Sequence, residues 1–303
     1  MIKVNVKDET SSLETVILGI ASDFGGTPDI EECYDPKSRE NVSNQTFPVE
    51  QDIIREMNDL FDILVKYDVN VLRPSNISDL NQVFVRDIGF VIDETFIVPN
   101  IIKDRSSEIR GVSKILEQIV SNKVFMPKEA RLEGGDLILF HDYIFIGYSK
   151  LQDFEKFKVS RTNQNGVNFI HDHFQYKTVK SFELNKSDID PFSNALHLDC
   201  CFQPIGRSHA ILCKQGFKNL DDIDFIINLF GEDNIILISQ EEMYRMCANV
   251  FSISEKVLIS ESSFVRINNI LRDKGFIVEE VTYSEVSKMG GLFRCSTLPL
   301  LRR

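Results

Sequence analysis

The sequence predicts an α/β fold made of about five units, each with the order strand, strand, helix, strand. Two observations support this prediction. Short apolar runs alternate with segments of helical apolar spacing, at a period of roughly 50–60 residues. No stretch rich in Pro, Gly or Ser divides the chain, which favours one compact unit over residues 1–303. The units differ in sequence, so an ordinary α/β sheet also fits the pattern, whereas a closed ring of units would bring the last segment back to the first.

The first unit is expected to contain a strand over 13–21, a helix over 48–67 and a returning strand over 69–74. The helix is strongly amphipathic, with Pro48 at its start and a row of apolar residues on one face. These apolar residues are Ile53, Ile54, Met57, Leu60, Phe61 and Leu64.

The later units repeat this order. In each, a strand or hairpin comes first, and a helix leads to the returning strand. The expected ranges of these three parts are 84–100, 108–122 and 123–127; 136–147, 165–174 and 177–184; 209–217, 221–231 and 234–239; and 249–260, 262–275 and 276–283.

The composition restricts the class of partner. The chain carries 46 acidic and 34 basic side chains and a net charge of −12, with no tract of Lys and Arg. An acidic surface disfavours nucleic acid and anionic membranes and is compatible with a small cationic substrate. The N-terminal residues lack the apolar segment of a signal peptide, and no apolar run approaches the roughly 20 residues of a membrane span. The six cysteines form no CxxC pair, so we expect reduced thiols in a cytoplasmic protein, with a homo-oligomer compatible with the sequence.

Cys295 is the candidate nucleophile. Arg294 beside it supplies a positive charge of the kind that lowers a thiol pKa. Gly290 and Gly291 allow backbone N–H groups to approach a substrate closely. A buried structural cysteine is the alternative, but this polar, glycine-rich segment favours the chemical role.

His197 is the candidate acid–base residue. It lies in an apolar segment that is predicted to be a strand, with Asp199 two residues on, so both side chains are expected on one face. The alternative is a core histidine bonded to a backbone carbonyl. His171 and His173 are expected at the surface. No group of residues has metal-ligand spacing, so no metal is expected.

Two acids and two arginines give weaker individual signals. Glu133 stands before a Gly-Gly-Asp turn, and Asp87 ends a segment that is predicted to be a strand, where a turn acid explains it as well as a functional one. Arg161 and Arg105 would ordinarily be surface residues. Taken together, several carboxylates favour a cationic group such as a planar guanidinium, and arginines favour an anion such as a carboxylate. A molecule with both groups is arginine or a relative of it.

At these motifs the chain resembles the guanidino-group modifying enzymes of the pentein superfamily, namely arginine deiminases, dimethylarginine dimethylaminohydrolases and amidinotransferases. NQVFVRD (81–87) is similar to the deiminase strand with a substrate-binding aspartate, EGGD is common to deiminases and dimethylaminohydrolases, and SRTNQNG is similar to the latter. LHLD and GGLFRCSTLPL are most similar to the deiminases. The resemblance runs from about Leu13 to the C-terminus. It implies a five-bladed α/β propeller of pseudo-symmetric ββαβ units, the pentein fold, with the active site in its central channel.

For catalysis, the resemblance implies Cys295 as nucleophile, His197 as general acid and base, and Glu133 as the residue that orients the imidazole. The expected reaction is hydrolysis of a guanidino group through a covalent amidino-cysteine intermediate, with release of ammonia or an alkylamine and no cofactor. Transfer of the amidino group to an acceptor amine is the alternative, because it shares the first half of the reaction. A non-catalytic binding scaffold would have no reason to keep Cys, His and Glu together.

For binding, the resemblance implies five residues. Asp87 and Asp199 would grip the guanidinium nitrogens. Asn81, Arg161 and Arg105 would hold the carboxylate of an amino-acid substrate. The expected partner is therefore a small cationic guanidino compound.

Overall fold

A computed structural model describes residues 1–303 as strands, α-helices and short 3-10 helices. The strands are β1 (Leu13–Leu18), β2 (Asn70–Leu72), β3 (Phe90–Ile92), β4 (Thr95–Val98), β5 (Asn122–Phe125), β6 (Leu137–Phe140), β7 (Tyr143–Tyr148), β8 (Thr178–Glu183), β9 (Phe202–Ile205), β10 (His209–Leu212), β11 (Ile235–Leu237), β12 (Phe251–Ser252), β13 (Val257–Glu261), β14 (Ile277–Val281) and β15 (Thr297–Arg302). The α-helices are α1 (Pro36–Ser43), α2 (Glu50–Lys66), α3 (Ser113–Gln118), α4 (Leu151–Lys156), α5 (Gln164–His173), α6 (Leu220–Phe230), α7 (Gln240–Tyr244), α8 (Val265–Asp273) and α9 (Ser284–Ser287). Three of the 3-10 helices carry site residues, and they are η1 (Val85–Ile88), η4 (Gly134–Asp136) and η6 (Leu198–Cys200).

The strands form five three-stranded sheets that share one topology. The sheets are β15-β1-β2, β3-β4-β5, β6-β7-β8, β9-β10-β11 and β12-β13-β14. In each sheet the first of these strands runs antiparallel to the second, and the second pairs in parallel with the third. The parallel strands are joined through α2, α3, α5, α6 and α8, one helix for each sheet. The predicted ββαβ unit and its fivefold repetition are therefore confirmed.

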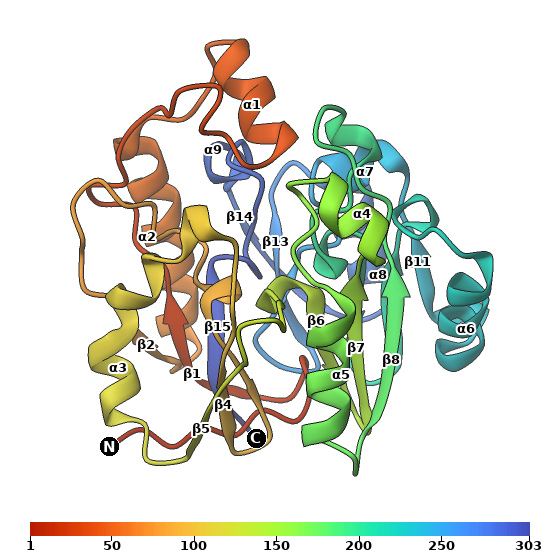
Figure 1. The fold of residues 1–303 in the computed structure, drawn as a ribbon. Coiled ribbons are helices and arrows are strands. Elements are labelled where there is room, and N and C mark those ends of the chain that lie inside the picture. Colours follow the sequence, from red (N-terminus) through yellow and green to blue (C-terminus); the bar gives the residue numbers. More distant parts are fainter.

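The last strand of the chain completes the first sheet. β15 pairs antiparallel with β1, so that Val16 lies opposite Pro299 and Leu18 opposite Thr297. Figure 1 shows β15 beside β1, although the two strands come from opposite ends of the chain. This pairing closes the ring and gives the C-terminal segment a fixed place within it, as predicted.

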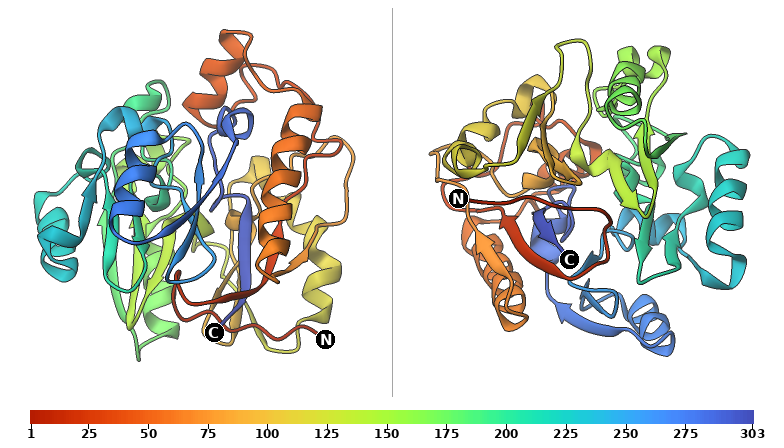
Figure 2. Two further views of the ribbon diagram at one scale, coloured as in Figure 1. Left: turned by 180° about the vertical axis from the view of Figure 1, so that it is seen from behind. Right: turned by 90° about the horizontal axis from the view of Figure 1, so that it is seen from below.

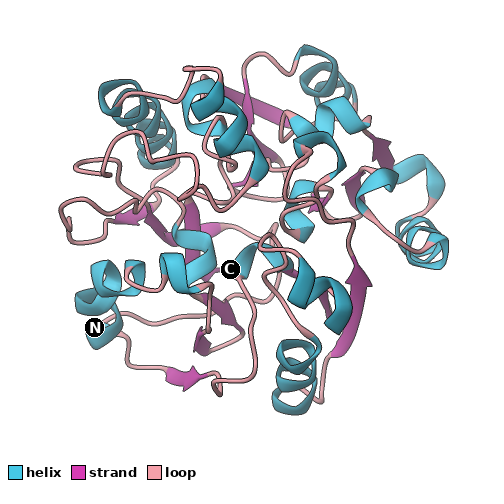
Figure 3. Cartoon of the chain, turned by 45° about the horizontal axis from the view of Figure 1, so that its top comes forward, coloured by secondary structure: helices cyan, strands magenta, loops and turns pink.

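The helices lie outside the sheets. The view from below shows α2, α3, α5, α6 and α8 spaced around the periphery, with the C-terminal segment near the middle (Figure 2, right). Figure 3 shows the chain tilted so that its top comes forward, with longer helices along the outside and the C-terminus near the middle of the view. Because every sheet turns its first strand inward, the segments that precede these strands meet in the middle of the molecule.

The helix α2 illustrates how burial follows the sequence pattern. Ile53, Met57, Leu60 and Leu64 are buried, spaced three or four residues apart on one face. Acidic residues occupy the first turn and Lys66 the last, which complements the helix dipole. The helix begins at Glu50, slightly later than the predicted start. No helix of the protein is both long and apolar enough to cross a membrane.

Two segments that were predicted to be strands are 3-10 helices. Asp87 lies within η1, and Asp199 within η6, which follows His197 directly. The strands begin only at Phe90 and Phe202. In these turns each carboxylate accepts a hydrogen bond from another unit, Asp87 from the N–H of Gly135 and Asp199 from Arg294. The prediction that His197 and Asp199 share one face of a strand is therefore wrong.

We expect the closing strand to be essential for stability. Leu298 is fully buried opposite Ile17 in the β1–β15 pair. Leu298→Ala should lower the free energy of unfolding by about 2–5 kcal/mol, because it removes buried methyl groups and leaves a cavity. Urea denaturation measures this loss. Leu301→Ala is the matched control, because Leu301 is only half-buried in the same strand and its truncation should cost less than half as much. Equal losses for the two variants would contradict the assigned register.

Candidate active site

Polar residues stand directly before the first strand of every sheet. All of them are at most 3% exposed, and they come from five different places in the chain. They are Asp87 before β3, Glu133 before β6, His197 and Asp199 before β9, Asn249 before β12 and Cys295 before β15. The backbone N–H of Arg86 donates to the carbonyl oxygen of Cys295, which ties η1 to the last of these segments. The fold therefore gathers these groups into one buried cluster.

His197 is held between two carboxylates. Its Nε2 lies 2.9 Å from Oε2 of Glu133, and its Nδ1 lies 3.7 Å from Oδ1 of Asp87. Because an ionised carboxylate only accepts hydrogen bonds, Nε2 carries a proton. Burial alone lowers the pKa of His197, but Asp87 and Glu133 outweigh it and raise the pKa above its ordinary value. The imidazolium form is thus favoured in the unliganded site.

Glu133 is the most highly connected acid of the cluster. Its Oε2 also accepts from Nη1 of Arg161 at 3.1 Å, and its Oε1 accepts from the backbone N–H of Ile102 at 3.1 Å. Burial raises the pKa of Glu133, but Arg161, His197 and Arg105 more than offset it and hold the pKa far below its usual range. Glu133 is therefore held as an anion in contact with the ring of His197.

The two glycines after Glu133 let the backbone pass close to the histidine. A Cβ on Gly135 would lie 2.6 Å from Nδ1 of His197, and one on Gly134 would lie 2.1 Å from the carbonyl oxygen of Arg86. The N–H of Gly135 donates to Oδ1 of Asp87 at 3.0 Å. The EGGD motif therefore needs glycine at both positions, because a Cβ atom would not fit at either of them.

Asp136 of the same motif has a different place. Its carboxylate accepts from the hydroxyl of Thr162 at 2.7 Å and from the backbone N–H of Leu198 at 2.9 Å. Burial raises its pKa. Asp136 therefore joins three of the site segments to one another and has no oxygen turned toward a substrate.

The thiol of Cys295 lies among acceptors and one neutral donor. Its Sγ is 3.8 Å from Oδ2 of Asp199 and 3.3 Å from Nδ2 of Asn249. Burial raises the pKa of Cys295 well above its usual value, and Asp199 and Asp87 raise it further. The unliganded protein therefore keeps this thiol protonated at neutral pH.

The expected effect of Arg294 on this thiol is wrong. Its guanidinium is bonded to other groups, because Nη1 donates to Asp199 at 2.8 Å and Nη2 donates to Glu9 at 2.9 Å and to the carbonyl oxygen of Leu137 at 2.7 Å. Arg294 is completely buried. It compensates the charge of two carboxylates and does not activate the thiol.

Arg105 and Arg161 are buried, so the alternative that they are surface residues is wrong. Arg105 forms a two-point ion pair with Glu108, donates to Asp87 at 2.6 Å and donates to the carbonyl oxygen of Phe84. Arg161 donates to Glu133 through Nη1, and its other nitrogens donate to backbone carbonyls, including that of Tyr34 at 2.7 Å. Both arginines brace the carboxylate cluster in the unliganded protein.

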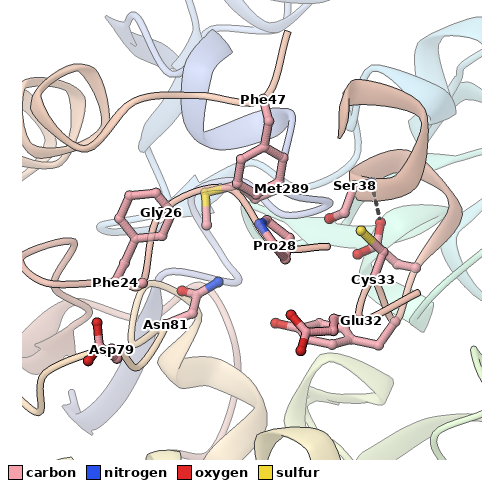
Figure 4. Close-up of a pocket in the computed structure, with 13 residues that line it drawn as sticks. Phe24, Gly26, Pro28, Glu32, Cys33, Ser38, Phe47, Asp79, Asn81 and Met289 are labelled. Atoms are coloured by element: carbon pink, nitrogen blue, oxygen red, sulfur yellow. Dashed lines mark hydrogen bonds between the residues drawn. The ribbon is translucent and has the colours of Figure 1, made fainter. Parts of the chain in front are cut away.

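A pocket of about 200 Å³ lies apart from the cluster, and none of the six clustered residues lines it. It lies between the loop that precedes α1 and the segments around Asn81 and Met289. Figure 4 shows Phe47 and Met289 at the top of this pocket, with Asp79, Asn81 and Glu32 below. Tyr34, whose carbonyl oxygen binds Arg161, also lines it. The structure thus places Asn81 in this pocket, apart from the other predicted site residues.

One group of residues could hold a metal ion, although the sequence contains no motif with metal-ligand spacing. Ligand atoms of Asp87, Glu133 and His197 lie within 4.8 Å of one another. However, Arg105 and Arg161 already supply positive charge to these two acids. Their N–H groups already occupy carboxylate oxygens that a metal ion would need as ligands.

Sequence reasoning missed two residues of the site, Asn249 and Glu9. Glu9 stabilises Arg294 from the N-terminal segment, and nothing in its sequence surroundings indicates this. Asn249 could have been found, because it stands before the first strand of its unit as the other site residues do in theirs. His171, His173 and His141 are exposed, which confirms the surface prediction for the first two.

Comparison with known proteins gives one family and several relatives. The family model described as N,N dimethylarginine dimethylhydrolase, eukaryotic, matches residues 34–302. The uncharacterised protein YkgA of Bacillus subtilis is 28% identical over 73% of this chain and 70% of its own. An arginine deiminase of Listeria monocytogenes is 26% identical over 56% of this chain and 47% of its own, so the match spans about half of the deiminase.

A solved structure shows the same fold at lower sequence similarity. The inosamine-phosphate amidinotransferase StrB1 from Streptomyces griseus superposes with a TM-score of 0.79 and 15% identity. The superposition covers 100% of this chain and 97% of that one. It agrees with the five-unit architecture described above.

The buried ion pairs predict a specific response to acid. Burial raises the pKa of Glu9, but Arg294 and Arg86 outweigh it and lower the pKa to about 2. A carboxylate with a lowered pKa stabilises the fold above its unfolded value near 4.5, and the contribution is lost as pH falls toward 2. Glu9→Gln should therefore cost on the order of 3 kcal/mol at pH 7 and flatten the loss of stability between pH 4.5 and 2.

Denaturant unfolding at several pH values measures this difference. Glu14→Gln is the control, because Glu14 pairs with the exposed Arg303 at the surface and should contribute at most about 1 kcal/mol. The assignment fails if the two variants show the same stability and the same dependence on pH.

Proposed function

Because the chain belongs to the N,N-dimethylarginine dimethylhydrolase family, we propose that it hydrolyses the guanidino group of arginine or an arginine derivative through Cys295. The family and the deiminase relatives restrict the activity to hydrolysis or transfer of an amidino group. The observation that carries the proposal is the convergence of a thiol, an imidazole and carboxylates from separate units in one buried cluster. We propose further that residues 1–303 act as a single catalytic domain.

The guanidinium group would bind between Asp87 and Asp199. Both carboxylates raise the pKa of the neighbouring thiol in the unliganded site. A bound guanidinium cation would neutralise this negative charge and favour the thiolate of Cys295. Substrate binding and formation of the nucleophile would then be coupled, which protects the thiol when no substrate is present.

The thiolate would attack the guanidinium carbon and form a carbon–sulfur bond. The imidazolium of His197 would give its proton to the leaving nitrogen, so that ammonia or an alkylamine departs and an amidino-thioether remains on Cys295. Neutral His197 would next accept a proton from water, whose oxygen attacks the same carbon. The carbon–sulfur bond would break and release a ureido product. The second proton of that water would go to the departing sulfur. Each cycle would thus consume one water, restore the thiol and the imidazolium, and release to solvent the proton that the thiol loses when the substrate binds.

Glu133 would keep His197 in place through both proton transfers, since its charge stabilises the imidazolium at 2.9 Å. Arg161 would bind the substrate's carboxylate. Its Nη2 donates to the neutral carbonyl of Tyr34 beside the pocket, and a carboxylate is the stronger acceptor for the same donor. Asn81 would contact the amino-acid end from the pocket. Each nitrogen of Arg105 donates to a protein oxygen, mostly to carboxylates, so its contacts favour the positioning of Asp87 over the predicted role in substrate binding.

Amidino transfer is the second candidate, supported by the fold shared with an amidinotransferase. It follows the same first half and differs only in the nucleophile that removes the amidino group from the cysteine. Bulk water and an acceptor amine would compete for the same intermediate.

We expect ammonia or amine release from guanidino compounds without any acceptor. The assay uses arginine, its N-methylated derivatives and agmatine, each with and without glycine as an acceptor amine. Arginine-type substrates should exceed agmatine in kcat/KM by about one to two orders of magnitude, because agmatine lacks the carboxylate for Arg161. Product formation that requires the acceptor would contradict hydrolysis and support transfer.

Variants of two buried cysteines control the assay. Cys295→Ala should reduce turnover at least about a thousandfold, because no other group can form the covalent intermediate. Cys213→Ala is the matched control, since Cys213 is equally buried but bonds only to Gln215 and Ser239. Equal activity of the two variants would contradict the assignment of the nucleophile.

A further inference from the structure

Asn249 occupies the position in its unit that the catalytic candidates occupy in theirs. It stands two residues before β12, as Cys295 stands two residues before β15. It is completely buried, and none of the motifs that suggested the active site includes it. A buried primary amide needs a partner for each of its polar atoms, so its contacts indicate what it does.

The contacts of Asn249 fix the orientation of its amide. Oδ1 accepts hydrogen bonds from the backbone N–H of Arg294 at 3.0 Å and from that of Cys295 at 3.3 Å. A flipped amide would set its NH₂ group against these two donors. The oxygen must therefore face the backbone, and Nδ2 must face the sulfur of Cys295, 3.3 Å away.

The surroundings of the sulfur make this donor important. The titratable groups around Cys295 are Asp87 from η1, Asp199 and Cys200 from η6, and Tyr283, which precedes α9. Each of them is neutral or negative, and Arg294 donates to Asp199 and Glu9 rather than to the sulfur. Asn249 is thus the side chain that offers a hydrogen bond to a thiolate in this position.

We propose that Asn249 is a catalytic residue, which fixes the backbone of the nucleophile with its oxygen and stabilises the thiolate of Cys295 with its N–H. The proposal rests on the function assigned to Cys295 above. The substrate cation would lower the energy of the thiolate from one side, and the amide would do so from the other. The amide also aims the sulfur, because it holds both backbone N–H groups of the segment that carries it.

A lower thiol pKa increases the rate only in part, because a less basic thiolate is also a weaker nucleophile. With a Brønsted coefficient of about 0.5, a pKa lowered by one unit gives roughly a threefold gain at a pH well below the pKa. The larger contribution should come from positioning of the sulfur. A variant that keeps the oxygen keeps this positioning, so it isolates the effect on the thiol pKa.

Two variants separate the positioning of the Cys295 backbone from the stabilisation of its thiolate. Asn249→Asp keeps an oxygen for the backbone N–H groups but replaces the donor by a further acceptor beside the sulfur. Asn249→Ala removes both contacts. The readout is the pH dependence of alkylation of Cys295 by iodoacetamide, which needs no turnover and so tests the inference separately from the proposed reaction. Cleavage after Arg294 and Arg302 places Cys295 alone in the peptide 295–302, so its alkylation can be followed by mass spectrometry.

We expect the alkylation midpoint to rise by about one pH unit or more in Asn249→Ala and further in Asn249→Asp. Asn268→Asp is the matched control, because Asn268 is equally buried but donates to Glu261 and Glu280, away from the site. Its midpoint should equal that of the wild type. A midpoint unchanged in Asn249→Asp would overturn the inference, as would a wild-type Cys295 that is not alkylated even at high pH.

Discussion

Compensation of buried negative charge is the constraint on which the rest of this structure depends. Among the buried carboxylates of the site region are Asp87, Glu133, Asp199 and Glu9, each at most 5% exposed, and a buried carboxylate without a partner would cost several kcal/mol. Each is paired with a buried guanidinium, namely Asp87 with Arg105, Glu133 with Arg161, and Asp199 and Glu9 with Arg294. Only the Asp199–Arg294 pair crosses between units of the ring, whereas the other pairs lie within one unit. The Asp199–Arg294 contact therefore both neutralises a carboxylate of the site and ties two units together.

The remaining imbalance gives the site its chemistry. The arginines pair with the carboxylates, but Asp87 and Asp199 still raise the pKa of the Cys295 thiol. A cation is required to complete the charge balance around the thiol, and the substrate of the proposed reaction is such a cation. In this account, selection of a guanidinium and generation of the thiolate are one event, and Asn249 supplies the neutral hydrogen bond that the protein itself contributes.

Much of this could be predicted from the sequence, because apolar periodicity identifies the helices and strands, and five short motifs identify most of the site. Helix α2 and the hairpin β6–β7 agree with their patterns. The backbone around Asp87 and Asp199 could not be predicted, since the turns there are imposed by hydrogen bonds to other units. The direction of Arg294 depends on Glu9, which is 285 residues away in the chain. Because Arg294 is adjacent to Cys295 in the sequence, a contact with the thiol was expected. In the structure Arg294 instead forms ion pairs with residues that are distant in the chain.

The most direct test of the central claim is the detection of the covalent intermediate on Cys295. The protein would be mixed with excess arginine, quenched with acid during turnover and cleaved with trypsin, and the peptide 295–302 analysed by mass spectrometry. The account predicts a peptide that carries the substrate's amidino group with its side chain, minus ammonia, and no such adduct in Cys295→Ala. Continued turnover with this peptide unmodified, or an adduct on another cysteine, would contradict it.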